Sequence, residues 1–218
     1  MNHRYCRSCR TEYIETEINL HVNILTDNDF IKDNILTEKG VLAGNIQEMH
    51  CLAMADILNG HLLDDLTVGE LASVLSIFTN VSVKQEDSIV NVHDIKCPDN
   101  VKNIISKIRK LYNKYYDIES YNQTAFANNY EIHYNMCEFI YRWCTASDEK
   151  ECYGIFDEAL YYNISRGEFI KAMLKINNVA NELVKLAEIQ SNMKLLEKIK
   201  LIPDITLKSI ATNQSLYL

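Results

Sequence analysis

The stretch that decides the fold is ISRGEFIKAMLKINNVANELVKLAEIQS, residues 164–191. It begins with Ser165-Arg166-Gly167-Glu168, the spacing of a capping box, in which the serine and glutamate side chains each accept a backbone N–H of the first helical turn. Ile164 and Phe169 flank this box and can close a hydrophobic staple. Apolar residues then recur at steps of three and four, which predicts an amphipathic helix. About 25 residues make a rod of roughly 37 Å, enough to cross a domain.

The opposite side of this helix is polar. Lys171 and Lys175 lie one turn apart, and Asn178 is the next step along the same face. Taken alone, such a pattern indicates only a solvated helix face.

Composition favours a helical protein with one main core. The chain has 218 residues, of which 47% are hydrophobic, so it can bury a core in one domain, with or without a small appendage. Two prolines and six glycines leave few helix breakers, and strand-like alternation is scarce. We therefore predict an all-α fold, a helical bundle with a long central helix. We assign residues 1–35 to an N-terminal helix and connection, and residues 36–218 to the bundle domain.

The remaining helices are predicted from apolar spacing and cap residues. A second capping box, Thr67-Val68-Gly69-Glu70, predicts a helix that continues through Phe78. The polar stretch 84–100, which contains Pro98, is the best candidate for a surface loop. Further helices are predicted over residues 11–25, 41–49, 51–58, 99–116, from 131 onward, 148–162 and 193–202, and residues 204–211 form a final segment after Pro203.

Charge and cysteine content narrow the class of protein. The net charge of −8 argues against a surface that binds nucleic acid everywhere, so any such contact must be local. The first residues lack the apolar run of a signal peptide, and no stretch approaches ~18 apolar residues. Seven scattered cysteines fit reduced thiols better than a disulfide framework. We expect a soluble intracellular protein, cytoplasmic or nuclear, without membrane contact.

Of two motifs that could carry chemistry, the first is rejected and the second leaves zinc binding as the less favoured of two interpretations. Asp157-Glu158-Ala159-Leu160 is similar to the start of a helicase DEAD box, but no G-x-x-x-x-G-K-[ST] loop precedes it and the segment has helical spacing. Cys6-Arg7-Ser8-Cys9 has zinc-knuckle spacing, but no second pair of ligands follows. We assign no catalytic residue and no metal site in this chain.

A basic face on the predicted helix 99–116 leaves two interpretations open. It combines lysines and an arginine with three tyrosines, which could hold a nucleic-acid backbone and stack on bases. We favour a solvated face whose tyrosines complete the core. The residues are Lys102, Lys107, Arg109, Lys110, Tyr112, Lys114, Tyr115 and Tyr116.

Separated stretches together resemble one family. They are LTEKGVLA at 36–43, DLTVGELASVLS at 65–76, GEFIKAML at 167–174 and the terminal SLYL at 215–218. In order and rough spacing they are similar to the DSHCT domain, the C-terminal helical domain of superkiller-like, exosome-associated DExH-box RNA helicases. The resemblance covers about residues 15–218.

The resemblance implies a function for the long helix. In that family the domain packs on two motor domains and closes a ring around the RNA, and its ratchet helix touches bases. By the family pattern, Lys171 and Lys175 fall on two arginines and Asn178 on a glutamate, so we expect these three residues to contact single-stranded RNA. Lysine offers a point charge where arginine stacks and forks, which weakens base contact. Trp143 matches a family tryptophan and is assigned to packing.

The resemblance also implies partners, and one alternative function stays open. The motor domains are expected in cis or in trans. ATP and magnesium are expected on those motor domains alone, with no cofactor in this chain, which would make it part of an ATP-dependent RNA helicase. The abundance of asparagine and isoleucine suits an AT-rich source such as a large DNA virus. The rival hypothesis is a non-catalytic protein-interaction module that binds a partner through an exposed apolar groove and does not bind RNA.

Overall fold

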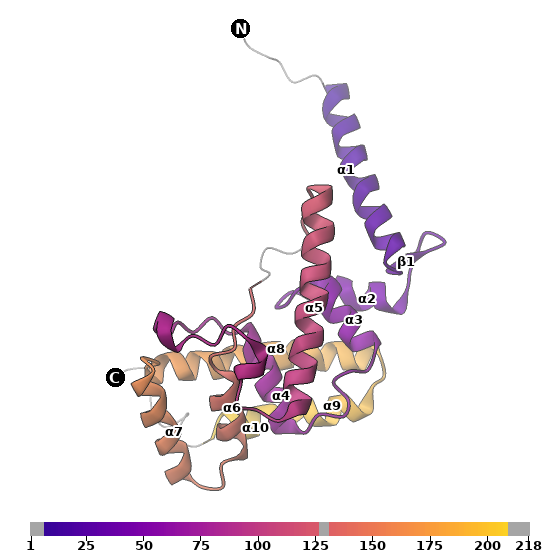
Figure 1. Ribbon diagram of the computed structural model, residues 1–218. Helices are drawn as coiled ribbons and strands as arrows, with labels where there is room; N and C mark the ends of the chain where they lie inside the picture. The colour runs from indigo at the N-terminus through magenta and orange to yellow at the C-terminus, as the bar shows by residue number, and fades with distance from the viewer. Residues whose placement is uncertain (1–6, 127–130, 209–218) are drawn as a thin grey trace.

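The computed structural model describes residues 7–126 and 131–208, with side chains from Ile14 onward. Over these residues the regular secondary structure is helical apart from one short antiparallel ribbon (Figure 1), which confirms the all-α fold class. The elements are α1 (Arg7–Asp27), β1 (Ile31–Lys32), β2 (Ile35–Leu36), α2 (Glu38–Gly44), α3 (Cys51–Asn59), α4 (Val68–Leu75), η1 (Ser76–Phe78), η2 (Gln85–Asp87), η3 (Val92–Asp94), α5 (Asp99–Asn122), α6 (Cys137–Thr145), α7 (Glu149–Tyr161), α8 (Arg166–Ile189), α9 (Met193–Lys200) and α10 (Ile202–Thr206).

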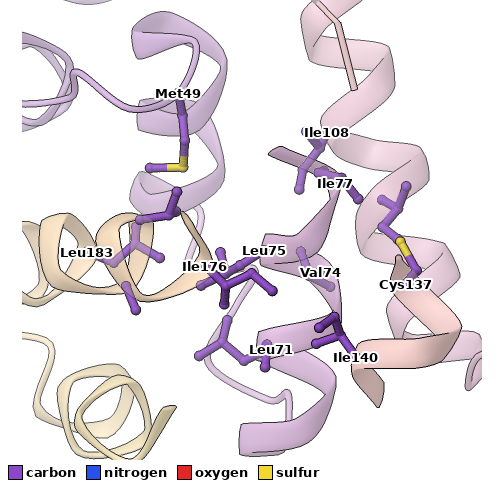
Figure 2. Close-up of a cluster of buried hydrophobic side chains, with 14 of the residues drawn as sticks. Met49, Leu71, Val74, Leu75, Ile77, Ile108, Cys137, Ile140, Ile176 and Leu183 are labelled. Carbon is purple, nitrogen blue, oxygen red and sulfur yellow. The ribbon is translucent and has the colours of Figure 1, made fainter. Parts of the chain in front are cut away.

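The core is built around α4. Every residue of this helix from Gly69 to Leu75 is buried. In Figure 2 its side chains lie between those of α8 on one side and those of α5 and α6 on the other. Each large apolar side chain that is fully removed from water contributes about 1.5–3 kcal/mol. The contacting residues that Figure 2 labels on these helices are Leu71, Val74, Leu75, Ile108, Cys137, Ile140, Ile176 and Leu183.

Both predicted capping boxes are confirmed. At the start of α8 the Glu168 N–H donates to Ser165 Oγ at 3.2 Å, and the Ser165 N–H donates to Glu168 Oε2 at 3.0 Å. Thr67 and Glu70 make the same exchange at the start of α4. Ile164 and Phe169, the two staple residues, are buried. These caps satisfy N–H groups that have no partner inside the helix, and they fix where each helix begins.

A buried junction joins three helices near the end of the described chain. Trp143 of α6 is fully buried, and its indole N–H donates to the carbonyl of Thr206 in α10 at 2.9 Å. The Thr206 hydroxyl in turn accepts from Asn177 Nδ2 of α8 at 2.8 Å. The packing role predicted for Trp143 is confirmed, and α10 is fastened to both α6 and α8.

Helix α1 projects away from the other helices (Figure 1). Ile14 and Ile18 are 45% and 55% exposed, and among the side chains that the structure describes the first buried one is Ile24. The apolar side predicted for this helix is therefore exposed at Ile14 and Ile18, although Leu25 packs against the core. No helix in the part of the chain that the structure describes is long and apolar enough to cross a membrane.

Some predicted boundaries were wrong. The helix predicted at 41–49 is α2, which begins at Glu38 and ends at Gly44. The helix predicted from residue 131 begins at Cys137. The helix predicted to end at Pro203 ends at Lys200, and Pro203 instead lies in the first turn of α10, where its missing N–H costs nothing. The predictions for Cys6 and for the ending at 215–218 fall outside the described residues.

Candidate nucleic-acid interface

The three predicted contact residues share one face of α8. At 100° per residue, Lys171, Lys175 and Asn178 fall within roughly 60° of one another around the helix axis. Lys171 and Asn178 are exposed, and Lys175 is half-buried. Glu168, Glu182 and Lys185 continue the same line, and we call these six residues the α8 stripe.

Adjoining hollows follow the stripe along the helix. The first, of about 180 Å³, is lined by Lys171, Lys175 and the segment 79–81. The second, of about 500 Å³, shares Asn80 and Lys175 with the first, and we call it the central hollow. The third, also of about 500 Å³, shares Gln47 and Glu48 with the central hollow and reaches Lys185. The polar face of α8 is therefore bordered by concave surface over most of its length.

The wall opposite the stripe is the turn between α2 and α3. The backbone N–H groups of Gln47 and Glu48 both donate to the Glu182 carboxylate, at 2.8 and 2.9 Å. The Glu48 carboxylate pairs with the ammonium of Lys175. Both acidic residues therefore shape the surface around Lys175, and neither was among the predicted site residues. Spacing could have identified Glu182, which is in step with Lys171, whereas Glu48 gives no local signal.

The charges on the stripe are mixed. Glu48 pairs with Lys175, whereas within the described residues no carboxylate forms an ion pair with Lys171. The pKa of Glu168 lies below its ordinary value because the carboxylate accepts hydrogen bonds from the Ser165 backbone and hydroxyl, with a smaller contribution from Lys171. Lys171 is thus more available to a phosphate than Lys175, which becomes available when its pairing with Glu48 opens.

A buried neutral histidine lies beside the central hollow. The His50 side chain caps α3, and its backbone N–H donates to the Tyr112 hydroxyl at 3.1 Å. Burial lowers the pKa of His50 to about 4, with a smaller opposing contribution from its hydrogen bond to the backbone. The imidazole is therefore neutral at pH 7, although Glu119 Oε1 lies 3.7 Å from Nε2. His50 is 1% exposed, so it holds the structure together and does not exchange protons with a ligand.

The basic face of α5 behaves largely as we favoured. Tyr112 and Tyr115 are 3% and 0% exposed and complete the core, whereas Tyr116 is 54% exposed. Arg109 donates to the Val90 carbonyl at 3.1 Å and to the Tyr134 hydroxyl at 2.9 Å, so its guanidinium is committed to the protein.

Of the two motifs weighed for chemistry, the acidic one has structural partners and the cysteine pair is not tested by the described residues. Asp157 and Glu158 lie in α7 and pair with Arg166 and Arg142. The side chain of Cys9 is outside the described part of the chain. Among the residues that the structure does describe, no group of three histidine, cysteine, aspartate or glutamate side chains could hold a metal ion.

Comparison with known families gives one match. The model of the DSHCT (NUC185) domain family matches residues 33–210, a range that contains the whole α8 stripe. No curated protein matches the chain.

Proposed function

Because the chain belongs to the DSHCT (NUC185) family, the C-terminal domain of superkiller-like helicases, we propose that it guides single-stranded RNA along α8 for an ATP-dependent helicase motor. The motor domains would bind ATP and magnesium and would contact this domain in cis or in trans. The observation that carries the proposal is the alignment of Lys171, Lys175 and Asn178 on the polar face of α8, beside a row of adjoining hollows.

The chemistry of the stripe suits loose, sequence-tolerant contact with a moving strand. A lysine ammonium holds a phosphate as a point charge and does not select a base. Asn178 is exposed and carries an amide that can donate to or accept from a base edge. Intervening carboxylates, including Glu182, limit how tightly a polyanion is held. A weakly held strand can advance, which is what a motor requires.

The direct test is an RNA titration of the chain across salt concentrations. Labelled single-stranded RNA is followed by fluorescence anisotropy. Lys171→Ala should weaken binding and make the slope of log K against log salt shallower by about 0.7, the value for one lost contact with a single strand. Lys175→Ala should have the same effects with a smaller change of slope, because Glu48 already pairs with this lysine. Lys150→Ala, an exposed lysine on α7, is the control and should change neither quantity. Equal affinity in all variants would contradict the proposal.

The second test includes the motor. With the helicase motor domains present, Lys171→Ala with Lys175→Ala should lower RNA unwinding and leave the ATPase rate without RNA unchanged. Lys107→Ala with Lys110→Ala on α5 provides the matched comparison. A loss of unwinding in the α5 variant and not in the α8 variant would assign RNA to the other basic face.

A second candidate function is protein interaction through α1. The observation in its favour is the exposed apolar side chains of Ile14, Ile18 and Val22 on a projecting helix, outside the residues that the family model matches. Ile14→Lys with Ile18→Lys should then reduce association with the motor domains in a sedimentation experiment without changing RNA affinity. Association equal to wild type would remove this candidate.

A further inference from the structure

The central hollow differs in chemistry from the rest of the stripe. The linings of its two neighbours contain no aromatic side chain, whereas the central hollow is lined by Phe78, Tyr112 and Phe126. Its volume of about 500 Å³ lies in the range of small-molecule sites. Phe78 and Phe126 are half-buried, so each keeps part of its ring surface accessible.

The aromatic rings are held in place by their neighbours. Phe78 and Tyr112 are stacked with an interplanar angle of 29° and centroids 6.4 Å apart. The His21 ring of α1 meets the Phe126 ring edge-on, with centroids 4.9 Å apart. The Tyr112 hydroxyl is fixed by the His50 N–H. Rings that are already ordered lose little entropy when a flat ligand stacks on them.

The hollow opens onto the path proposed for RNA. Lys175 and Asn80 line both the central hollow and the neighbouring hollow that contains Lys171. A phosphate on Lys175 would therefore place an adjacent base within reach of the aromatic lining. Gln47 and Asn80 are exposed at the rim and carry amides that can pair with a base edge.

We propose that the central hollow is a nucleobase subsite, in which one base turned out of the strand stacks against Phe78 and Phe126 while its phosphate contacts Lys175. This inference rests on the proposed function, since it assumes that the strand follows the α8 stripe. A lysine or arginine side chain of a protein partner is the competing occupant, because the Glu131 carboxylate also lines the hollow, and N-acetyl-arginine amide represents this occupant in the test below.

The test compares ligands that differ by one base. Adenosine 5′-monophosphate and ribose 5-phosphate carry the same sugar and phosphate, and their binding to the chain is measured by amide chemical shifts. Stacking of one base should make the nucleotide bind roughly 5- to 150-fold more tightly. Its shifts should lie in the segments 46–51 and 78–80, which line the hollow.

Variants of Phe126 separate stacking from folding. Phe126→Ala should reduce the advantage of the nucleotide over ribose 5-phosphate, with the remainder due to Phe78, whereas Phe126→Tyr, which keeps a ring, should retain the full difference. Tyr121→Ala, at a side chain that is 87% exposed on α5, is the control and should retain it too.

The outcomes distinguish this inference from the proposed function. Equal affinity for the two ligands, or a preference that is unchanged in Phe126→Ala, would overturn the subsite, and so would binding of N-acetyl-arginine amide in place of the nucleotide. In each case a loss of RNA affinity in Lys171→Ala would still support RNA on the stripe. Base-dependent binding that is reduced in Phe126→Ala, with RNA affinity that does not depend on Lys171, would support the subsite and contradict the proposed path of the strand.

Discussion

Lys175, one of the three residues proposed to bind RNA, already has an anionic partner within the protein. The Glu48 carboxylate already pairs with its ammonium, so RNA must displace an internal anion before a phosphate can bind. Side chains of this pair are 36% and 38% exposed, and pairs in such surroundings contribute at most about 1 kcal/mol. The pairing of Glu48 with Lys175 should therefore lower the affinity for RNA without preventing binding.

Glu48→Gln should strengthen RNA binding. Removal of the competing charge frees Lys175, so the dissociation constant for single-stranded RNA should fall by up to about fivefold, the equivalent of about 1 kcal/mol. The salt dependence should steepen by up to about 0.7 in log–log slope. Anisotropy titration measures both quantities. Glu188→Gln removes a charge from α8 away from the stripe and should give a smaller change, whereas an equal gain would show that the effect is not local.

His50 should make the protein sensitive to mild acid. In the folded protein the pKa of His50 is about 4, below the ordinary value of 6.5. As pH falls below 6.5, His50 is therefore protonated in the unfolded chain but not in the folded chain. Stability is thus complete above pH 6.5 and is lost as pH falls toward 4, by about 3 kcal/mol in total. His50→Asn keeps an N-cap acceptor and should flatten this part of the curve of unfolding free energy against pH.

The pH experiment on His50 needs a control histidine, and its result depends on the charged groups around the imidazole. His93→Asn, at an exposed histidine, should retain the wild-type curve. Glu119, Tyr112, Tyr115 and Cys51 lie around the imidazole, and Glu119 is the group whose negative charge would oppose the loss of stability. A wild-type curve that is flat between pH 6.5 and 4 would show that Glu119 compensates for burial.

At the scale of whole elements, local chemistry predicted some helices well. Capping boxes specified the starts of α4 and α8, because the bonds that define them lie within four residues. The start of α6 was wrong because residues before Cys137 bond to distant segments: the His133 N–H donates to the Ile77 carbonyl, and Asn135 bonds to Val81 and Ile89. Apolar spacing carries no information about such partners.

The turn that faces the α8 stripe also depends on long-range contacts that local sequence does not predict. Residues 41–49 have helical spacing, but the N–H groups of Gln47 and Glu48 bond to Glu182 in α8, and α2 ends at Gly44. The sequence predicted the face of α8 that carries Lys171, Lys175 and Asn178. It could not predict the opposite wall, because the two partners are more than a hundred residues apart in the chain.

Helix α10 should depend on one hydroxyl group. Thr206→Val keeps the shape of the side chain but leaves the Asn177 amide without one of its two acceptors, and Asn177 is 7% exposed. An unsatisfied buried donor costs about 1–3 kcal/mol, which urea unfolding can measure. Thr145→Val, at an exposed position that bonds only within α6, should cost less. Equal losses of stability in the two variants would mean that the change in helix propensity, and not the hydrogen bond at the junction, causes the effect.

At the scale of the whole molecule, α1 should be separable from the rest. Deletion of residues 1–20 removes no side chain that the structure shows as buried, and residues 14–19 are exposed, so the melting temperature should change by less than about 2 °C. Deletion of residues 1–30 also removes Ile24 and Phe30, which are buried, and should destabilise the protein by about 3–5 kcal/mol or more. Calorimetry of both truncated chains tests the difference, and a large loss from the shorter deletion would show that α1 belongs to the core.

The buried junction at Trp143 gives the molecule an internal optical reporter. The sequence contains one tryptophan, so all indole emission comes from this site, which is shielded from water by the rings of Phe156 and Phe169 and bonded to α10. Departure of α10 would admit water and shift that emission to longer wavelength. The α8 stripe takes no part in the indole's ring contacts or its hydrogen bond, so a ligand bound there should leave the spectrum unchanged. The emission wavelength of Trp143 therefore distinguishes binding of a ligand to the stripe from partial unfolding in every variant described above.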